Sequence, residues 1–193
     1  YVNDAGNQIN NLALSIQARY LDLCGIPTEM PKDGYHGPEI IEAANRFYEE
    51  VGNKYANDEN AFEFFKENGV ENLLNELKKD LIDFRVGFDV WFSEKSLYEN
   101  NEVEKTINFL KENNYTYELD GAIWLKTSDF DDEKDRVIVK TDGTYTYITP
   151  DIAYHKNKLD RGYTMLIDVL GGDHHGYINR LKAAIEMVGG KSD

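Results

Sequence analysis

The sequence predicts an α/β fold in which a parallel sheet is interrupted by a helical stretch. Between residues 81 and 193, short segments with strand character alternate with segments of helical apolar spacing. Residues 25–80 carry helical spacing alone, and a glycine-rich turn follows the last strand candidate. Because an order of strand, helix, strand, helix is typical of parallel sheets covered by helices, we expect one α/β unit with a helical insertion.

Helical apolar spacing marks three stretches of the first half. The first covers residues 9–23 and ends at Gly25, where a glycine can close the helix. The second covers residues 40–51, and the third covers residues 70–81. Each stretch repeats apolar residues at intervals of three or four, which predicts three amphipathic helices.

The second half changes to a mixed pattern. Residues 88–92, 122–126 and 136–140 are rich in β-branched and aromatic side chains and predict short strands. Residues 102–113 predict a short helix between them.

Two further elements follow towards the end of the chain. Thr149, Pro150 and Asp151 offer a hydroxyl cap, a first-turn proline and a first-turn acid, so a helix should run to about Leu159. Residues 165–170 predict a buried strand, and a glycine-rich turn then leads into a helix over residues 178–188.

Length and composition exclude several classes of protein. With 193 residues and 41% hydrophobic content, the chain can bury a full core. We find no apolar run long enough to cross a bilayer and no signal peptide in the first twenty residues. The single cysteine, Cys24, excludes an internal disulfide and a cysteine-rich zinc site. We therefore expect a cytoplasmic protein with no membrane partner.

The net charge of -15 argues against a broad nucleic-acid surface, because phosphate contacts need clustered lysine and arginine. The chain opens at Tyr1 on a motif-like stretch without an initiator methionine, so we expect a piece of a longer protein.

The turn Gly171–Gly176 is the most informative candidate site. It lies between a strand candidate and a helix start, where doubly wound sheets bind nucleotides. Asp173 could accept hydrogen bonds from ribose hydroxyls, and His174 or His175 could contact the base, the phosphates or an amino acid. Two alternatives stay open: a tight turn capped by Asp173, and a metal site that would need ligands from elsewhere.

Tyr147 and Asp151 form a second candidate site at the start of a predicted helix. A carboxylate beside a tyrosine hydroxyl suits a guanidinium, which presents a planar fork of N–H donors. The alternative is that Asp151 only complements the helix dipole.

Polar residues cluster at a third place, the stretch Tyr1–Ile9. Asn3 or Asp4 as a helix cap would explain most of them without a ligand. Gly6 and Gln8 are harder to explain, because a glycine in a first helical turn costs about 1 kcal/mol relative to alanine and suggests that something approaches closely. The acidic run Asp129–Glu133 lacks calcium-loop spacing and predicts a solvated hairpin tip.

Six blocks of the sequence, taken in order, resemble the arginyl-tRNA synthetase family. They are Tyr1–Ile9, Asp33–Gly37, Phe88–Glu94, Lys140–Thr144, Tyr147–Tyr154 and Gly171–Tyr177. The resemblance spans nearly the whole chain. It implies an incomplete Rossmann-type parallel sheet of the class I synthetases, with a helical insertion and a small β-hairpin region. It also implies the use of ATP and Mg²⁺ to activate arginine before transfer to tRNA(Arg).

The resemblance also implies a division of the chain and a set of amino-acid contacts. Residues 1–24 would be an active-site segment, 25–80 the helical insertion and 81–193 the second part of the catalytic domain. Tyr147 and Asp151 match family residues that hold the arginine guanidinium, and His174 stands where the family often has a glutamine against the substrate. Asp4 and Gln8 match the segment that lines the amino-acid pocket.

For the nucleotide, the resemblance implies that Gly171, Asp173 and His175 border the adenosine of ATP. The HIGH-type motif should precede Tyr1 and the KMSKS-type loop should follow Asp193, and neither occurs in the sequence. Since those groups stabilise charge on the transferring phosphates, we expect no catalytic residue within this chain and an inactive fragment on its own. We expect tRNA(Arg) to bind mainly through parts of the enzyme outside this chain.

Two other function classes compete with the ligase. A metal-dependent hydrolase could use Asp173, His174 and His175, together with Asp129 or Asp131. A noncatalytic module could instead bind a basic partner through its acidic surface.

Overall fold

The computed structural model describes residues 1–191, except for the side chains of residues 173–175. The chain divides into two compact units, residues 1–92 and residues 93–193. Each unit has its own helices and its own buried side chains.

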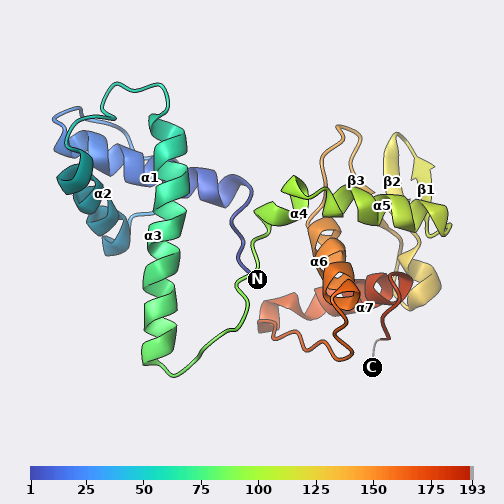
Figure 1. The fold of residues 1–193 in the computed structure, drawn as a ribbon. Coiled ribbons are helices and arrows are strands. Elements are labelled where there is room, and N and C mark those ends of the chain that lie inside the picture. Colours follow the sequence, from blue (N-terminus) through green and yellow to red (C-terminus); the bar gives the residue numbers. More distant parts are fainter. Residues whose placement is uncertain (192–193) are drawn as a thin grey trace. The chain divides into compact units, whose positions relative to one another are not determined.

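The first unit is helical. It consists of α1 (Asn7–Leu23), α2 (Pro38–Val51) and α3 (Ala61–Asp83). Helix α1 packs against both α2 and α3, and α3 crosses α1 in Figure 1. Aromatic rings fill the core, where the ring of Tyr20 lies 4.8 Å from that of Phe65. The Tyr20 hydroxyl donates to the carbonyl of Gly52 at 2.6 Å, so this buried polar group is satisfied. The predicted helices at 9–23 and 40–51 are confirmed, and the third exists but begins at Ala61, nine residues before the predicted stretch.

The start of α1 differs from the prediction. Gly6, not Asn3 or Asp4, is the residue before the helix, and it has a φ of 85°. A Cβ at Gly6 would meet nothing within 4 Å. The positive φ of Gly6 is a backbone conformation that other residues rarely adopt, which is a sufficient reason for a glycine at this position.

The end of the first unit belongs to no strand, although the N–H of Val2 donates to the carbonyl of Phe92 at 2.7 Å. The predicted strand at residues 88–92 is wrong, because these residues form no ladder with any described residue. Phe88 and Val90 are exposed. Their strand-like composition reflects a local preference for extended backbone, which makes a strand only where a partner supplies hydrogen bonds.

The second unit mixes helices with a small sheet. Its elements are α4 (Lys95–Glu99), α5 (Glu102–Glu112), β1 (Thr116–Leu119), β2 (Ala122–Leu125), η1 (Thr127–Phe130), β3 (Arg136–Val139), α6 (Ile148–Asp160), η2 (Gly172–Tyr177) and α7 (Ile178–Met187). The predicted helices at 102–113 and 178–188 and the predicted strands at 122–126 and 136–140 are confirmed to within a few residues.

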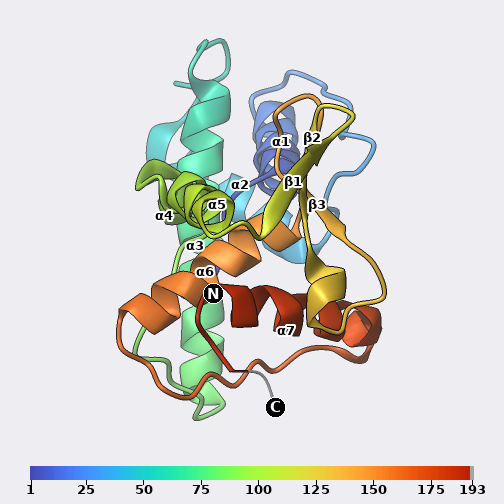
Figure 2. The same cartoon turned by 90° about the vertical axis from the view of Figure 1, so that its right-hand side faces the viewer.

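The three strands form an antiparallel meander in the order β1-β2-β3, seen in Figure 2. Thr116 pairs with Leu125, and Ile123 pairs with Val139. Asp120 and Gly121 join β1 to β2 with positive φ angles of 52° and 76°, as a tight two-residue hairpin requires. The predicted α/β class and the β-hairpin region are confirmed, but the strands described here pair antiparallel and not parallel.

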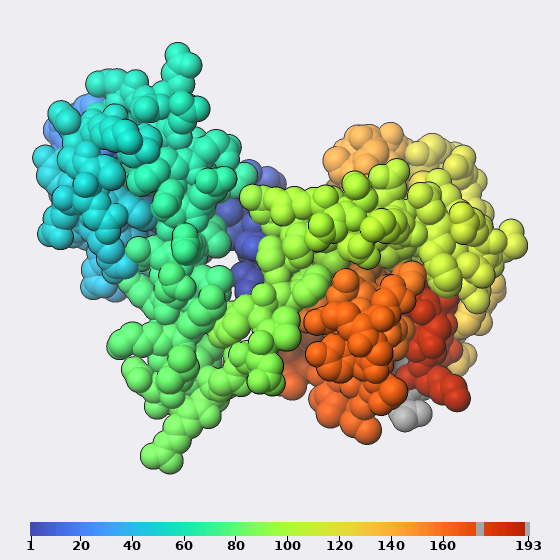
Figure 3. All heavy atoms as spheres, in the orientation of Figure 1, coloured from blue at the N-terminus to red at the C-terminus, as the bar shows by residue number. Residues whose placement is uncertain are grey.

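The predicted buried strand at residues 165–170 is wrong. Met165, Ile167 and Val169 are 77%, 78% and 95% exposed. Apolar side chains gain burial only when a sheet or helix covers them, and none of the described elements covers Met165, Ile167 or Val169. Atoms of this segment and of the end of α6, orange in Figure 3, lie on the surface of the second unit.

The acidic run Asp129–Glu133 lies between β2 and β3, and Asp129, Asp131 and Glu133 are exposed as predicted, but Asp132 is not. Asp132 is buried and bonded to Arg136, which ties this loop to β3. Among the described residues, no helix is long and apolar enough to cross a membrane.

Candidate functional site

The start of α6 is fixed to the sheet by two threonines. The Thr146 hydroxyl donates to the carbonyl of Val137 at 2.7 Å, and the Thr149 hydroxyl donates to the carbonyl of Ile138 at 2.7 Å. Thr149 is therefore not the helix cap that the sequence predicted, because its hydroxyl serves β3 and the helix begins at Ile148. These bonds hold the first turn of α6 in place.

Asp151 lies in this first turn and is half-buried. Its Oδ2 accepts a hydrogen bond from the hydroxyl of Tyr177, the residue at the junction of η2 and α7. Burial raises the pKa of Asp151 and outweighs the opposing effect of the Tyr177 hydrogen bond. Because burial disfavours the charged form of this carboxylate, a cation that reaches Asp151 would stabilise that charged form.

Tyr147 precedes α6 and lies one helical turn before Asp151. Its side chain is 92% exposed. Tyr147 is open to solvent, whereas Asp151 is half-buried. That both side chains contact one ligand stays a prediction from their spacing of four residues.

A buried histidine stands one turn beyond Asp151. His155 is 5% exposed, and its Nε2 lies 2.8 Å from Oδ2 of Asp168, while Lys158 donates to Oδ1 of Asp168 at 3.1 Å. The pKa of Asp168 is lowered well below its ordinary range, mainly by the hydrogen bond with His155. These contacts fasten the segment after α6 back onto the helix.

Glu94 and Tyr98 bring a second carboxylate into the neighbourhood. The Tyr98 hydroxyl lies 3.4 Å from Oε1 of Glu94, and the rings of Tyr98 and Tyr145 stack 6.2 Å apart. Burial, then the charge of Glu94, raises the pKa of Tyr98 to about 12, and the charge of Asp151 adds to the effect. The charges of Glu94 and Asp151 therefore both raise the pKa of the Tyr98 hydroxyl.

Sequence reasoning missed several of these residues. Glu94 and Tyr177 stand at the ends of two of the six blocks, and His155 follows Asp151 by four residues. That spacing was the available signal, because it places the histidine on the Asp151 face of the helix.

The glycine-rich turn forms η2, which leads directly into α7. Gly171, Gly172 and Gly176 are exposed, and a Cβ at Gly172 or Gly176 would meet nothing within 4 Å. The side chains of Asp173, His174 and His175 lie outside the described part of the structure.

Asp4 and Gln8 belong to the other compact unit. Asp4 is half-buried before α1, and Gln8 is exposed in its first turn. Beyond its first turn, α1 packs against α2 and α3.

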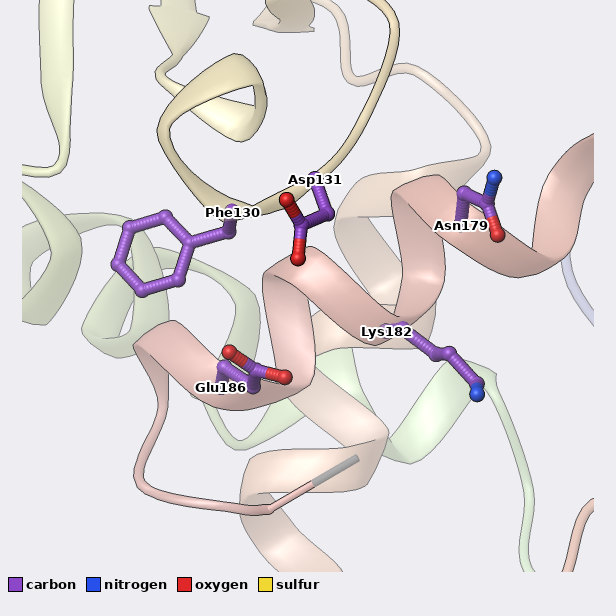
Figure 4. A pocket seen from close by; sticks show the side chains of 5 residues that line it. All are labelled: Phe130, Asp131, Asn179, Lys182 and Glu186. Carbon is purple, nitrogen blue, oxygen red and sulfur yellow. The ribbon is translucent and has the colours of Figure 1, made fainter. Parts of the chain in front are cut away.

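A shallow hollow of about 280 Å³ lies elsewhere in the second unit. Figure 4 shows its lining, which is Phe130, Asp131, Asn179, Lys182 and Glu186. Its lining residues do not include Asp151 or the residues bonded to it, so we build the site on Asp151 and not on this hollow.

Comparison with known proteins gives a consistent result. The model of the catalytic domain of class I tRNA synthetases (R) matches residues 13–192. Proteins named arginine–tRNA ligase from Bacillus subtilis and Oceanobacillus iheyensis are 54% and 53% identical over 191 residues, which is 98% of this chain. The chain spans 34% of the length of each of these relatives.

Solved structures agree. A crystal structure named for an arginyl-tRNA synthetase from Campylobacter jejuni superposes with a TM-score of 0.89 at 40% identity, over 98% of this chain and 42% of that one. A Plasmodium falciparum arginyl-tRNA synthetase, 17% identical with a TM-score of 0.65 over 98% of this chain and 32% of that one, shares the fold. The hydrolase alternative has no support from these matches.

Proposed function

The chain belongs to the family of class I tRNA synthetases specific for arginine, and from this premise we propose that it forms part of an ATP-dependent arginine–tRNA ligase. The reaction would join the arginine carboxylate to the α-phosphate of ATP with release of pyrophosphate. The arginyl group would then pass to a hydroxyl of tRNA(Arg) with release of AMP. Because the chain spans about a third of the length of its curated relatives, the activity is assigned to the whole protein that contains it.

Asp151 carries the proposal for arginine. Its carboxylate is half-buried and its pKa is raised by that burial, so an incoming guanidinium would recover the free energy that burial costs. A guanidinium offers two parallel N–H donors to a carboxylate, whereas a lysine ammonium is a point charge that cannot match the same geometry. The exposed Tyr147 hydroxyl would complete the contact from the same helix face.

Glu94 is a second acid for the same ligand. Its effect on the Tyr98 hydroxyl, shared with Asp151, supports a place near the guanidinium. Two carboxylates and several hydroxyls around a five-donor cation would satisfy more of its N–H groups than one acid could.

The nucleotide would lie against η2. The open space around Gly172 and Gly176 leaves this backbone accessible to a ligand, which fits an adenosine bordered by Gly171, Asp173 and His175. When bound, ATP would supply the α-phosphate that the arginine carboxylate attacks, with pyrophosphate as the leaving group. We propose that Mg²⁺ arrives on the phosphates of ATP, because magnesium in proteins is commonly held by substrate phosphates together with few protein ligands.

The remaining assignments are proposals of the same kind. His174, Asp4 and Gln8 would contact arginine, with residues 1–24 as an active-site segment, 25–80 as a helical insertion and 81–193 as the second part of the catalytic domain. tRNA(Arg) would bind mainly through other parts of the protein, which the net charge of -15 supports. We propose a cytoplasmic location, which the single cysteine, Cys24, fits.

The test is arginine-dependent ATP–pyrophosphate exchange by the full-length protein that contains this chain. We expect exchange with arginine and none with lysine. Asp151→Asn should lower kcat/KM for arginine by about 100-fold, because a neutral amide cannot pair with the guanidinium charge. Asp160→Asn is the matched control, since Asp160 lies at the end of the same helix in an exposed pair with Lys156. Equal exchange with lysine, or full activity of the Asp151 variant, would refute the proposal.

A further inference from the structure

We infer that Tyr177 is a positioning residue for arginine, whose hydroxyl orients the Asp151 carboxylate and links it to the glycine-rich turn. The inference rests on the proposed function, because it concerns the same arginine site. It adds a residue that does not itself contact the amino acid.

The first support is the geometry at the carboxylate. Tyr177 donates to Oδ2 of Asp151, and both side chains are half-buried. A carboxylate has about four acceptor positions on its two oxygens, so one bond from a hydroxyl leaves room for a guanidinium fork. Fixing one oxygen in advance removes rotational freedom that arginine would otherwise have to restrict on binding.

The second support is the path of the chain between α6 and α7. This segment is fastened to α6 at two places, because Asp168 is bonded to His155 and Lys158 while Tyr177 is bonded to Asp151. Positions 151, 155 and 158 follow the spacing of one helix face. Gly171 and Gly172 lie between the two attachment points. The hydrogen bond from the Tyr177 hydroxyl therefore joins the glycine-rich turn directly to the carboxylate of Asp151.

The third support is electrostatic. Burial raises the pKa of Tyr177 far above its ordinary value, so the phenol keeps its proton and remains a donor at neutral pH. Its hydrogen bond lowers the pKa of Asp151, which burial raises. The other ionisable groups that act on Asp151 are His155 and Lys158, which lower its pKa, and Asp168, which raises it. Asp151 in turn raises the pKa of Tyr98 on α4. Arg180 lies 5.5 Å from the centre of the Tyr177 ring and also faces this site.

The experiment uses the Tyr177→Phe variant of the full-length protein in the exchange assay. Loss of a hydrogen bond to a charged group should raise KM for arginine about 10-fold, with kcat changed by less than about 3-fold. Without the donor, the pKa of Asp151 rises, so the acid limb of the kcat/KM profile for arginine should move to higher pH. Tyr163→Phe is the matched control, because it removes a hydroxyl from an exposed tyrosine of the same segment.

Two further variants separate positioning from simple stability. Asp168→Asn breaks the other attachment and removes a negative charge, so it should not move the acid limb upward. Replacing Tyr177 by 3-fluorotyrosine keeps the ring and makes the hydroxyl a stronger donor, so the acid limb should move downward. Unchanged arginine KM and an unchanged acid limb in both Tyr177 variants would overturn the inference. Absence of arginine-dependent exchange in the unaltered protein would instead count against the proposed function.

Discussion

The guanidinium of Arg136 forms two hydrogen bonds with the carboxylate of Asp132. Nε lies 2.7 Å from Oδ2 and Nη2 lies 2.7 Å from Oδ1, and the two side chains are only 14% and 2% exposed. This pair anchors the loop after η1 to the start of β3. It determines how stable the hairpin region is and how that stability depends on pH.

Removing the charge of Asp132 should destabilise the chain. We expect Asp132→Asn to lower the free energy of unfolding by about 3 kcal/mol, because the Arg136 charge is then left largely buried without its counterion. Urea unfolding followed by circular dichroism measures the change. Glu99→Gln, in an exposed pair with Lys95, is the control and should stay within about 0.5 kcal/mol of the unaltered chain. Equal effects of the two substitutions would contradict the role given to the buried pair.

The same pair predicts a loss of stability in acid. The hydrogen bond from Arg136 is the main reason that the pKa of Asp132 lies below its ordinary value, and burial opposes it. The folded pKa is therefore below the unfolded pKa of about 4. The stabilisation is complete above the unfolded value and is lost as the pH falls through the folded value. Urea midpoints should fall more steeply below about pH 4 in the unaltered chain than in Asp132→Asn; parallel curves would exclude this contribution.

Tyr147 should matter for ligand binding and not for folding. Since its side chain is almost fully exposed, Tyr147→Ala should change the free energy of unfolding by less than about 0.5 kcal/mol. KM for arginine in the full-length protein should rise by roughly 10-fold, as expected for loss of one hydrogen bond to a charged ligand. Tyr48→Ala, at an exposed tyrosine of α2, is the control for the kinetic effect. An arginine KM that matches this control would remove Tyr147 from the site.

Gly34 should not tolerate a side chain. A Cβ at this position would lie 2.8 Å from Pro31 Cγ, 2.8 Å from the Pro31 carbonyl and 3.0 Å from Ser15 Oγ. Ser15 Oγ also accepts the N–H of Tyr35 at 2.9 Å, so the loop has little freedom to move away. Gly34→Ala should cost about 2 kcal/mol in unfolding free energy. Gly87→Ala, where a Cβ meets nothing within 4 Å, should be close to neutral.

Helices could be predicted more reliably than strands because a helix satisfies its own backbone. The apolar spacing of α1, α2 and α7 is sufficient to locate these helices in the sequence, and their predicted ranges are confirmed to within a few residues. Residues 88–92 and 165–170 have strand-like composition, but pairing depends on neighbours that local sequence does not specify. The hairpin of β1 and β2 is an intermediate case, since Asp120 and Gly121 supply a local turn signal.

The candidate site divides in a similar way. The assignment of Tyr147 and Asp151 to a guanidinium follows from their chemistry and their helical spacing, and it stays a prediction. The bonds of Asp151 with Tyr177 and of His155 with Asp168 join positions 26 and 13 residues apart. Contacts over such separations arise from the path of the chain between α6 and α7, which no periodicity in the sequence records.

The exposed stretch that ends at Leu170 has a practical consequence for work with this chain alone. Within the described residues, the main chain of residues 164–170 forms no backbone hydrogen bond, and every second side chain from Met165 to Val169 is a bare apolar group. The backbone groups of this stretch can pair with an extended segment of a second molecule. Concentrated samples should accordingly be prone to β-rich self-association, and a lysine at position 167 should keep them dispersed.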